Sequence, residues 1–174
     1  LTSGYNNIAA NGSTGQGAGY LYVVDVKTGA LLQMISTGSG TEASPAGLAQ
    51  VTAYIPDTAD GTVTEVYGGD LDGNVWRFEI NATQSATKLV TLVDDTTPTP
   101  VPQPITTKPL FAEFGSPPTA YVFVGTGRYL GTTDLASTQK QTVWGIKDTG
   151  TYPVATPRAT MSKLTITSDA NNIR

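Results

Sequence analysis

The sequence contains neither cysteine nor histidine. The chain therefore has no thiol nucleophile, no imidazole base, no Ser-His-Asp arrangement and no zinc site of the Cys/His kind. The lack of cysteine leaves the compartment open, because disulfides are permitted outside the cytoplasm without being required there. Much familiar catalysis is excluded.

Long apolar runs and basic clusters are missing as well. No run approaches the roughly 18 apolar residues of a membrane-spanning helix, so we expect no transmembrane segment. Ten Lys and Arg residues stand against fourteen Asp and Glu residues, which gives a net charge of −4. Because phosphate binding needs clustered positive charge, we expect no nucleic-acid partner. The chain starts at Leu1 with no initiator Met or signal-peptide pattern, so we expect a processed protein or a fragment.

The sequence is instead rich in glycine, proline and short β-type runs. It has 19 Gly, 11 Pro and 8 Tyr residues, and no long stretch follows the 3.6-residue period of a helix. A strand rich in β-branched and aromatic residues, a Gly-containing corner and a second strand recur at 19–35, 65–78 and 121–148. This pattern predicts an all-β chain that forms part of a β-propeller, with about three blade-like antiparallel sheets.

The repeats divide the chain into units. We expect a partial blade at 1–37, blades at 38–96 and 97–150, and at 151–174 a tail or the start of the next segment. Trp76 and Trp144 occupy equivalent places in their repeats, so we expect both to pack between blades. The alternate prolines of 96–104 predict an exposed connection between blades. Since propellers normally close a ring of about four to eight blades, the remaining part of the same propeller is an expected partner.

Five stretches of the sequence together resemble one family, the type IV pilus tip adhesins of the PilC/PilY type, in the C-terminal β-propeller region. The stretches occur in the family's order and cover roughly residues 3 to 150. They are SGYNN at 3–7, GYLYVVDVKTGALL at 19–32, VYGGDLDGNVWRFEI at 66–80, QPITTKPLF at 103–111, and VFVGTGRYLGTTDL with TQKQTVWGIKD at 122–148.

The resemblance implies a secreted protein that lies on the outer cell surface at the pilus tip. Such a protein supports pilus assembly, surface adhesion and twitching motility without catalysis. The implied partners are minor pilins or other pilus tip components, and a host or environmental surface receptor. Two alternatives stay open at this point. One is a propeller dehydrogenase of the quinoprotein kind, which Asp25 and Thr28-Gly29 suggest, although Gln33 stands where that repeat has Trp. The other is a surface-binding propeller outside the pilus system.

The family also implies a calcium loop just before the YGGDL strand. Here that place carries Asp57, Asp60 and Glu65, which we predict as the candidate calcium ligands. The register of the loop leaves fewer carboxylates than calcium's six to eight oxygen ligands usually require, so an Asp-Gly corner with solvated acids is the alternative.

A second acidic corner, Asp70-Leu71-Asp72-Gly73-Asn74, has its Gly fourth, whereas a calcium loop of the EF-hand type needs it sixth. We therefore predict a tight corner with a primed hairpin turn at Asp72-Gly73. For Arg128 we predict a structural ion pair with a carboxylate across blades, with binding of an anion as the alternative.

Overall fold

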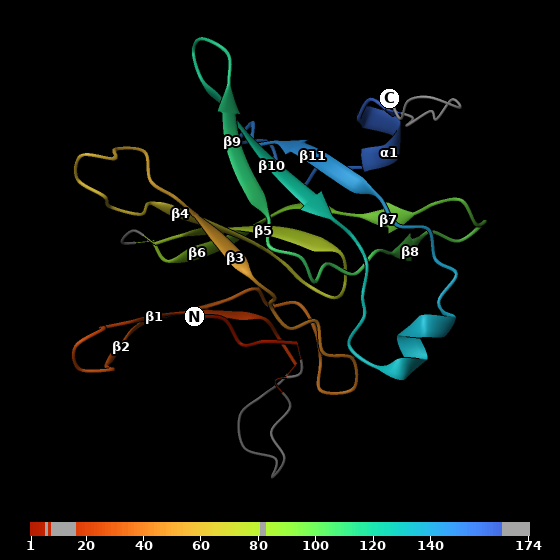
Figure 1. Cartoon of the computed structure of the whole chain (residues 1–174), viewed down its shortest axis with the longest axis horizontal. Helices are drawn as coiled ribbons and strands as arrows, with labels where there is room; N and C mark the ends of the chain where they lie inside the picture. The colour runs from red at the N-terminus through yellow and green to blue at the C-terminus, as the bar shows by residue number, and fades with distance from the viewer. Residues whose placement is uncertain (6, 8–16, 81–82, 165–174) are drawn as a thin grey trace, which may run out of the picture.

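The computed structural model describes residues 1–5, 7, 17–80 and 83–164, and these residues are almost entirely in strands and loops. Three antiparallel sheets lie one above another in Figure 1, with the first sheet nearest the N-terminus and the third nearest the short C-terminal helix. The prediction of an all-β chain is confirmed. Among the described residues, no helix is long and apolar enough to cross a membrane.

The first sheet is the hairpin of β1 (Tyr20–Val24) and β2 (Leu31–Ser36). The chain's first residues extend it, because Thr2 bridges antiparallel to Leu21. Asp25 closes the hairpin turn: its Oδ1 accepts hydrogen bonds from the backbone N–H of Lys27 at 2.9 Å and of Thr28 at 2.8 Å. The Asp-x-x-Thr-Gly sequence thus has a local structural explanation as a turn.

The second sheet has four strands in the order β3-β4-β5-β6. They are β3 (Val51–Tyr54), β4 (Glu65–Gly69), β5 (Asn74–Glu79) and β6 (Ser85–Thr91). Side chains alternate between the two faces of this sheet, as the period of a β-strand requires. One face points to the first sheet and the other to the third, so that this sheet is covered on both sides.

The third sheet has three strands in the order β11-β10-β9. They are β9 (Leu110–Phe114), β10 (Thr119–Gly125) and β11 (Val143–Lys147), and the small hairpin of β7 (Val93–Asp94) and β8 (Val101–Pro102) lies between the second and third sheets in the sequence. Two helical pieces complete the fold, the 3-10 turn η1 (Thr132–Ala136) and α1 (Pro157–Thr160). Within the described ranges no strand pairs with the outer edge of β11.

Two apolar clusters fill the spaces between the sheets. The first and second sheets meet at Leu21, Ile35, Leu48, Val66, Trp76 and Phe78. The second and third sheets meet at Tyr67, Val75, Leu89, Val90, Leu92, Ile105, Val122, Val124, Trp144 and Ile146. Trp76 and Trp144 each belong to one of these clusters and are each 6% exposed, which confirms that they pack between sheets.

The connection at 96–104 is only partly exposed, which corrects the prediction for this stretch. Residues 96–102 are exposed, but Gln103 and Pro104 are buried. The reason is that the side chain of Gln103 bonds to Trp144, Thr142 and the carbonyl of Lys140, and Ile105 enters the apolar cluster behind it. Buried polar groups of this kind are almost always hydrogen-bonded.

The described part of the tail folds back onto the second sheet. Val154 forms a parallel bridge to Val90, and Arg158 pairs with Asp95 at 2.8 Å while lying over the ring of Trp144. Residues 165–174 lie outside the described residues. The four strands β3–β6 fall inside the unit predicted at 38–96, and β8–β11 inside the unit predicted at 97–150; the boundaries of the units stay predictions.

Candidate functional site

The corner between β4 and β5 is organised by Asp70, which is 1% exposed. Its Oδ1 accepts the backbone N–H groups of Asp72 at 3.0 Å and Asn74 at 2.9 Å, and its Oδ2 accepts Asn74 Nδ2 at 2.9 Å and Trp76 Nε1 at 2.8 Å. Burial raises the pKa of Asp70 to about 6, although the hydrogen bonds from Asn74 and Trp76 act in the opposite direction. This carboxylate is occupied by protein donors, and the corner is structural.

The corner is not a two-residue primed turn, which corrects that detail of the sequence analysis. Type I′ turns need positive φ at both central residues, whereas within this corner Gly73 alone has positive φ, at 76°. The N–H of Gly73 bonds the carbonyl of Asp70 at 3.3 Å. A Cβ on Gly73 would lie 2.6 Å from the carbonyl oxygen of Leu92, so the close approach of the backbone between β6 and β7 also requires glycine here.

The same corner binds the connecting segments on either side of it. The N–H of Leu71 donates to the carbonyl of Ala46 at 2.9 Å, and the carbonyl of Asp70 accepts the N–H of Ile105 at 2.9 Å. Leu71 is thereby held at the loop end of the second sheet, beside the proline-rich connection to the third.

The loop that follows β10 forms a compact structure around Asp134. Its Oδ1 accepts Arg128 Nε at 2.9 Å, and its Oδ2 accepts the N–H groups of Leu130 at 2.8 Å and Gly131 at 3.2 Å. The hydrogen bond from Leu130 is the largest of the effects that lower the pKa of Asp134. Arg128 forms an ion pair, but the prediction of a partner across blades is wrong, because the partner lies six residues away in the same loop.

The segment that leads into β11 is fixed by two buried polar side chains. Asp94 Oδ2 accepts the N–H of Lys140 at 3.0 Å, and Gln103 Nε2 donates to the carbonyl of Lys140 at 2.6 Å. Gln139 then reaches across to the connection, where its Nε2 donates to the carbonyl of Pro102 at 2.7 Å, and Gln141 Nε2 donates to Gln139 Oε1 at 3.2 Å. Backbone and side chains here are held in one arrangement.

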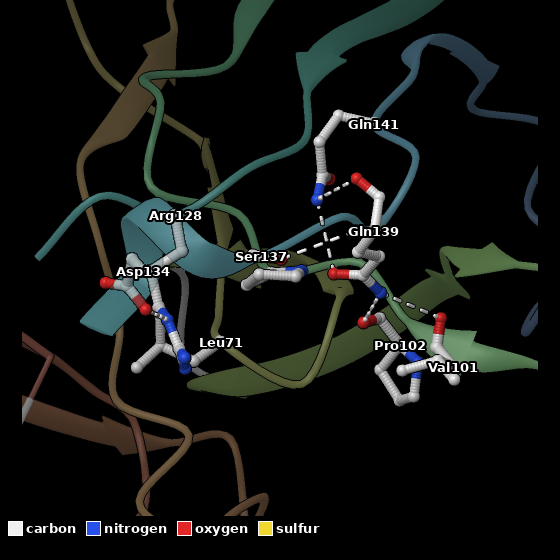
Figure 2. A pocket seen from close by; sticks show the side chains of 9 residues that line it. Leu71, Val101, Pro102, Arg128, Asp134, Ser137, Gln139 and Gln141 are labelled. Carbon is white, nitrogen blue, oxygen red and sulfur yellow. Dashed lines mark hydrogen bonds and ion pairs between the residues drawn. The ribbon is translucent and has the colours of Figure 1, made fainter. Parts of the chain in front are cut away.

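These three parts enclose a small depression, which we call the notch. Figure 2 shows Arg128, Asp134 and Leu71 on one side of it, Gln139, Gln141, Pro102 and Val101 on the other, and Ser137 between them. Its cavity volume is about 220 Å³, and its lining is completed by Pro104. That volume is below the roughly 300–1,000 Å³ of pockets for drug-sized ligands, so it suits a single side chain or a similarly small group.

A wider groove of about 560 Å³ runs beside the open edge of β11, between Val143 and Trp144 on the strand and Met161 and Leu164 on the tail. This groove lies at the edge of the third sheet, which has three strands where the second sheet has four. We treat the notch as the candidate site, because hydrogen bonds tie several of its lining residues in place.

The predicted calcium ligands occupy two different places. Asp57 and Asp60 lie in the turn between β3 and β4, where they accept the N–H groups of Ala59 and Thr62, respectively. Glu65 begins β4 and accepts the hydroxyl of Tyr67 at 3.0 Å. Among the residues that the structure describes, no three His, Cys, Asp or Glu side chains form a group that could hold a metal ion. In this arrangement the residues do not fit a calcium loop, and calcium binding here stays a prediction.

Sequence reasoning identified Arg128 and the Asp70 corner but missed the residues that join them into one site. Asp94, Gln103 and Gln139 form hydrogen bonds to residues that are 37 to 46 positions away in the sequence. One sequence pattern could have pointed to the connecting segments. It is Pro-x-x-Leu/Ile, which occurs at Pro45 to Leu48 and at Pro102 to Ile105. Both stretches lead into a sheet, and each packs its aliphatic residue in the apolar cluster between that sheet and the preceding sheet.

Comparisons with known proteins agree on one family. The model of the PilY1 beta-propeller domain family matches residues 1–171. A type IV pilus biogenesis factor PilY1 homolog of Xylella fastidiosa (strain Temecula1 / ATCC 700964) is 30% identical over 179 residues, which cover 92% of this chain and 11% of that protein. A second PilY1 homolog of the same organism is 36% identical over 93 residues, covering 53% of this chain and 7% of that protein.

The solved structures include a similar fold. The crystal structure of the Pseudomonas aeruginosa PilY1 C-terminal domain matches with a TM-score of 0.67 and 25% identity, over 78% of this chain and 32% of that one. The prediction of a β-propeller segment is confirmed. The chain spans about a tenth of the length of the curated relatives it matches.

Proposed function

The chain belongs to the PilY1 beta-propeller family of type IV pilus biogenesis factors, and from this premise we propose that it is a non-catalytic part of a pilus tip adhesin. In this role it supports pilus assembly, surface adhesion and twitching motility. The observation that carries the proposal is the family match, which extends over residues 1–171.

The architecture supports a binding role. Binding residues in proteins are commonly placed on loops that a rigid scaffold positions. Here two inter-sheet clusters form the scaffold, and the loops at 70–74 and 126–142 are fixed by buried Asp70, Asp94 and Gln103. The notch between these loops has fixed walls and is open to solvent, which suits contact with another macromolecule.

The proposed location is the outer cell surface, at the pilus tip. The proposed partners are minor pilins or other tip components, a surface receptor of the host or environment, and the remaining part of the same propeller. The last of these is supported by the third sheet, because Leu110, Phe114 and Val143 are exposed on it at 64%, 56% and 79%. Exposed apolar patches of this kind mark interaction surfaces.

Location is tested by immunogold labelling of intact cells with an antibody raised against this chain, together with blotting of sheared pili. We expect gold at pilus ends and a band in the sheared fraction. Label confined to the periplasm, with no band in the sheared pili, would contradict the proposal.

The contribution of this segment is tested in the full-length protein by replacing Phe78, whose side chain is fully buried between the first and second sheets. We expect cells that produce Phe78→Ala to lose surface pili, adhesion and twitching when the segment is destabilised. The control is Val26→Ala, which shortens an apolar side chain that is 95% exposed in the turn between β1 and β2. Normal pili and motility in the Phe78→Ala strain, at equal protein level, would remove this segment from the proposed role.

A further inference from the structure

We propose that the notch binds the carboxylate side chain of an aspartate or glutamate on a protein partner, and that Arg128 is the residue that holds it. The inference rests on the proposed function only for where that partner is met. The notch is defined by the loop at 128–141, the connection at 101–104 and Leu71.

The guanidinium of Arg128 is only partly used within its own loop. Its Nε is taken by Asp134, but within residues 1–5, 7, 17–80 and 83–164 its two terminal nitrogens have no hydrogen-bond partner. The side chain of Arg128 is 47% exposed, and it extends toward Leu71 along the notch in Figure 2. An arginine with its terminal nitrogens available presents the paired donors that match a carboxylate.

The charged groups that line the notch are Arg128 and Asp134. Asp134 is 8% exposed, and its two oxygens already accept hydrogen bonds from Arg128, Leu130 and Gly131. Both oxygens of Asp134 are thus used within the loop, whereas the terminal nitrogens of Arg128 are not bonded to any described residue. Among the described residues that line the notch, Asp134 is the single acid, so an incoming carboxylate meets a complementary positive group.

The size and the lining of the notch suit one acidic side chain. A volume of about 220 Å³ accommodates one side chain, and Leu71, Pro102 and Pro104 offer apolar contact for its methylene groups. None of the nine lining residues is aromatic, so the notch lacks the flat ring on which a sugar would stack. An acidic side chain of a protein therefore fits better than the uronate of an acidic glycan.

Hydrogen bonds within the chain hold the groups that border the notch in place. The carboxylate of Asp134 orients Arg128, Gln139 is tied to Pro102 at 2.7 Å, and the backbone of Lys140 is held by both Asp94 and Gln103. Because these groups are ordered before a ligand arrives, little conformational freedom is lost on binding.

The test is titration of the full chain, labelled with 15N, with a capped pentapeptide Gly-Ser-Glu-Ser-Gly while amide chemical shifts are recorded. We expect saturable shifts confined to residues 71, 101–104 and 128–141, with a dissociation constant on the order of millimolar for one charge-assisted contact. The peptide with Gln in place of Glu should bind about tenfold more weakly.

Substitutions in the chain give the matched comparison. Arg128→Gln should weaken binding of the Glu peptide about tenfold, whereas Lys108→Gln removes an exposed positive charge outside the notch and should leave the affinity unchanged. Should Arg128→Gln disturb the loop, Leu71→Glu provides a second route. It keeps the Arg128 to Asp134 pair and places an internal carboxylate beside the guanidinium, so it should likewise weaken binding of the peptide by about tenfold or more.

Several results would overturn the inference. They are equal binding of the Glu and Gln peptides, the absence of saturable shifts, an unchanged affinity in both variants, or tighter binding of an oligogalacturonate than of the Glu peptide. The outcome is separable from that of the proposed function. Peptide binding by a chain that is absent from sheared pili would leave the notch assignment standing and reject the pilus role.

Discussion

The second and third sheets carry the same sequence pattern but differ in how much of it is buried. Val75 pairs with Gly69 on the second sheet, and Val143 pairs with Gly125 at the corresponding place on the third. Val75 is fully buried, whereas Val143 is 79% exposed. The tryptophans that follow them, Trp76 and Trp144, are both 6% exposed.

The difference follows from the stacking order. Trp76 and Trp144 face the sheet that precedes their own, and that sheet is present in both cases. Val75 faces the sheet that follows, which is the third sheet. No further sheet in the described chain covers Val143, and the tail lies beside it across a groove. Each sheet of this architecture thus buries one face against its predecessor and needs a successor to bury the other.

The sharpest test of this difference replaces the same residue type in the two environments. Phe78 is fully buried and Phe114 is 56% exposed. Phe78→Ala should lower the free energy of unfolding by about 3 to 5 kcal/mol through lost burial and a residual cavity. Phe114→Ala should cost less than about 1 kcal/mol. Urea unfolding followed by circular dichroism measures both, and equal losses would mean that the outer face of the third sheet is covered in solution.

The corners of the two sheets should differ in their response to pH. Asp70 follows β4, and Thr126 holds the corresponding place after β10, where its hydroxyl accepts the N–H of Thr142 at 2.8 Å. Burial raises the pKa of Asp70 to about 6, above the roughly 3.9 of an unfolded aspartate. The folded state therefore binds this proton more tightly, and the stabilisation is complete below about pH 4 and is lost as the pH rises through about 6.

Asp70→Asn isolates this effect from the other acids. The difference in unfolding free energy between the unchanged chain and Asp70→Asn should fall between pH 4 and pH 7 by up to about 3 kcal/mol. Thr126→Ser serves as the control, because its difference from the unchanged chain should not vary with pH. A pH-independent difference for Asp70→Asn would show that the hydrogen bonds from Asn74 and Trp76 outweigh burial and keep the carboxylate ionised.

Glycine-to-alanine changes should have opposite signs in the two sheets. A Cβ on Gly69 would lie 2.3 Å from Ile105 Cγ2, whereas a Cβ on Gly125 would lie 3.8 Å from its nearest neighbour, Thr107 Oγ1. Gly69→Ala should destabilise by about 1 to 3 kcal/mol because it overfills the interface. Gly125→Ala should stabilise by roughly 0.4 to 1 kcal/mol, since the unfolded chain loses freedom and the extended backbone accepts alanine. Thermal unfolding of the two variants measures both effects. A lower stability in both variants would mean that the outer face of the third sheet is covered in solution.

The sequence predicted what is local in this fold. Strand, corner and strand could be located at β1–β2, β4–β5 and β10–β11 because alternation and turn residues act over a few positions. It could not predict the exposure of Val143, which depends on a neighbouring sheet and not on the strand's own residues. The return of the tail was missed for a similar reason, since it rests on long-range contacts of Arg158 with Asp95, Val93 and Trp144.

The candidate site was predictable only in pieces. Arg128 stood out as a charge in a Gly-rich loop, but its orientation depends on Asp134, and the opposite wall depends on Gln139 and buried Gln103. The three candidate calcium ligands were grouped because the family resemblance implies a calcium loop just before the YGGDL strand. The strand separates them, because Asp57 and Asp60 cap a turn while Glu65 bonds to Tyr67 within the sheet.

Calcium gives the smallest expected effect and concerns the hairpins that open the two sheets. The turn between β3 and β4 carries Asp57 and Asp60, whereas the turn of Gly115 to Pro118 between β9 and β10 has no acid. If the first turn binds calcium as extracellular modules do, with a dissociation constant of about 10⁻⁴ to 10⁻³ M, then 1 mM calcium should stabilise the chain by about 0.4 to 1.4 kcal/mol. Because Asp57 and Asp60 lie in the turn while Glu65 bonds to Tyr67, the expected result is an unchanged Tm. A higher Tm with calcium that disappears in the double variant Asp57→Asn, Asp60→Asn and persists in Glu42→Gln, an exposed acid elsewhere, would instead establish the site. A Tm that does not respond to calcium would count against the site, because a ligand bound by the native state alone must stabilise that state.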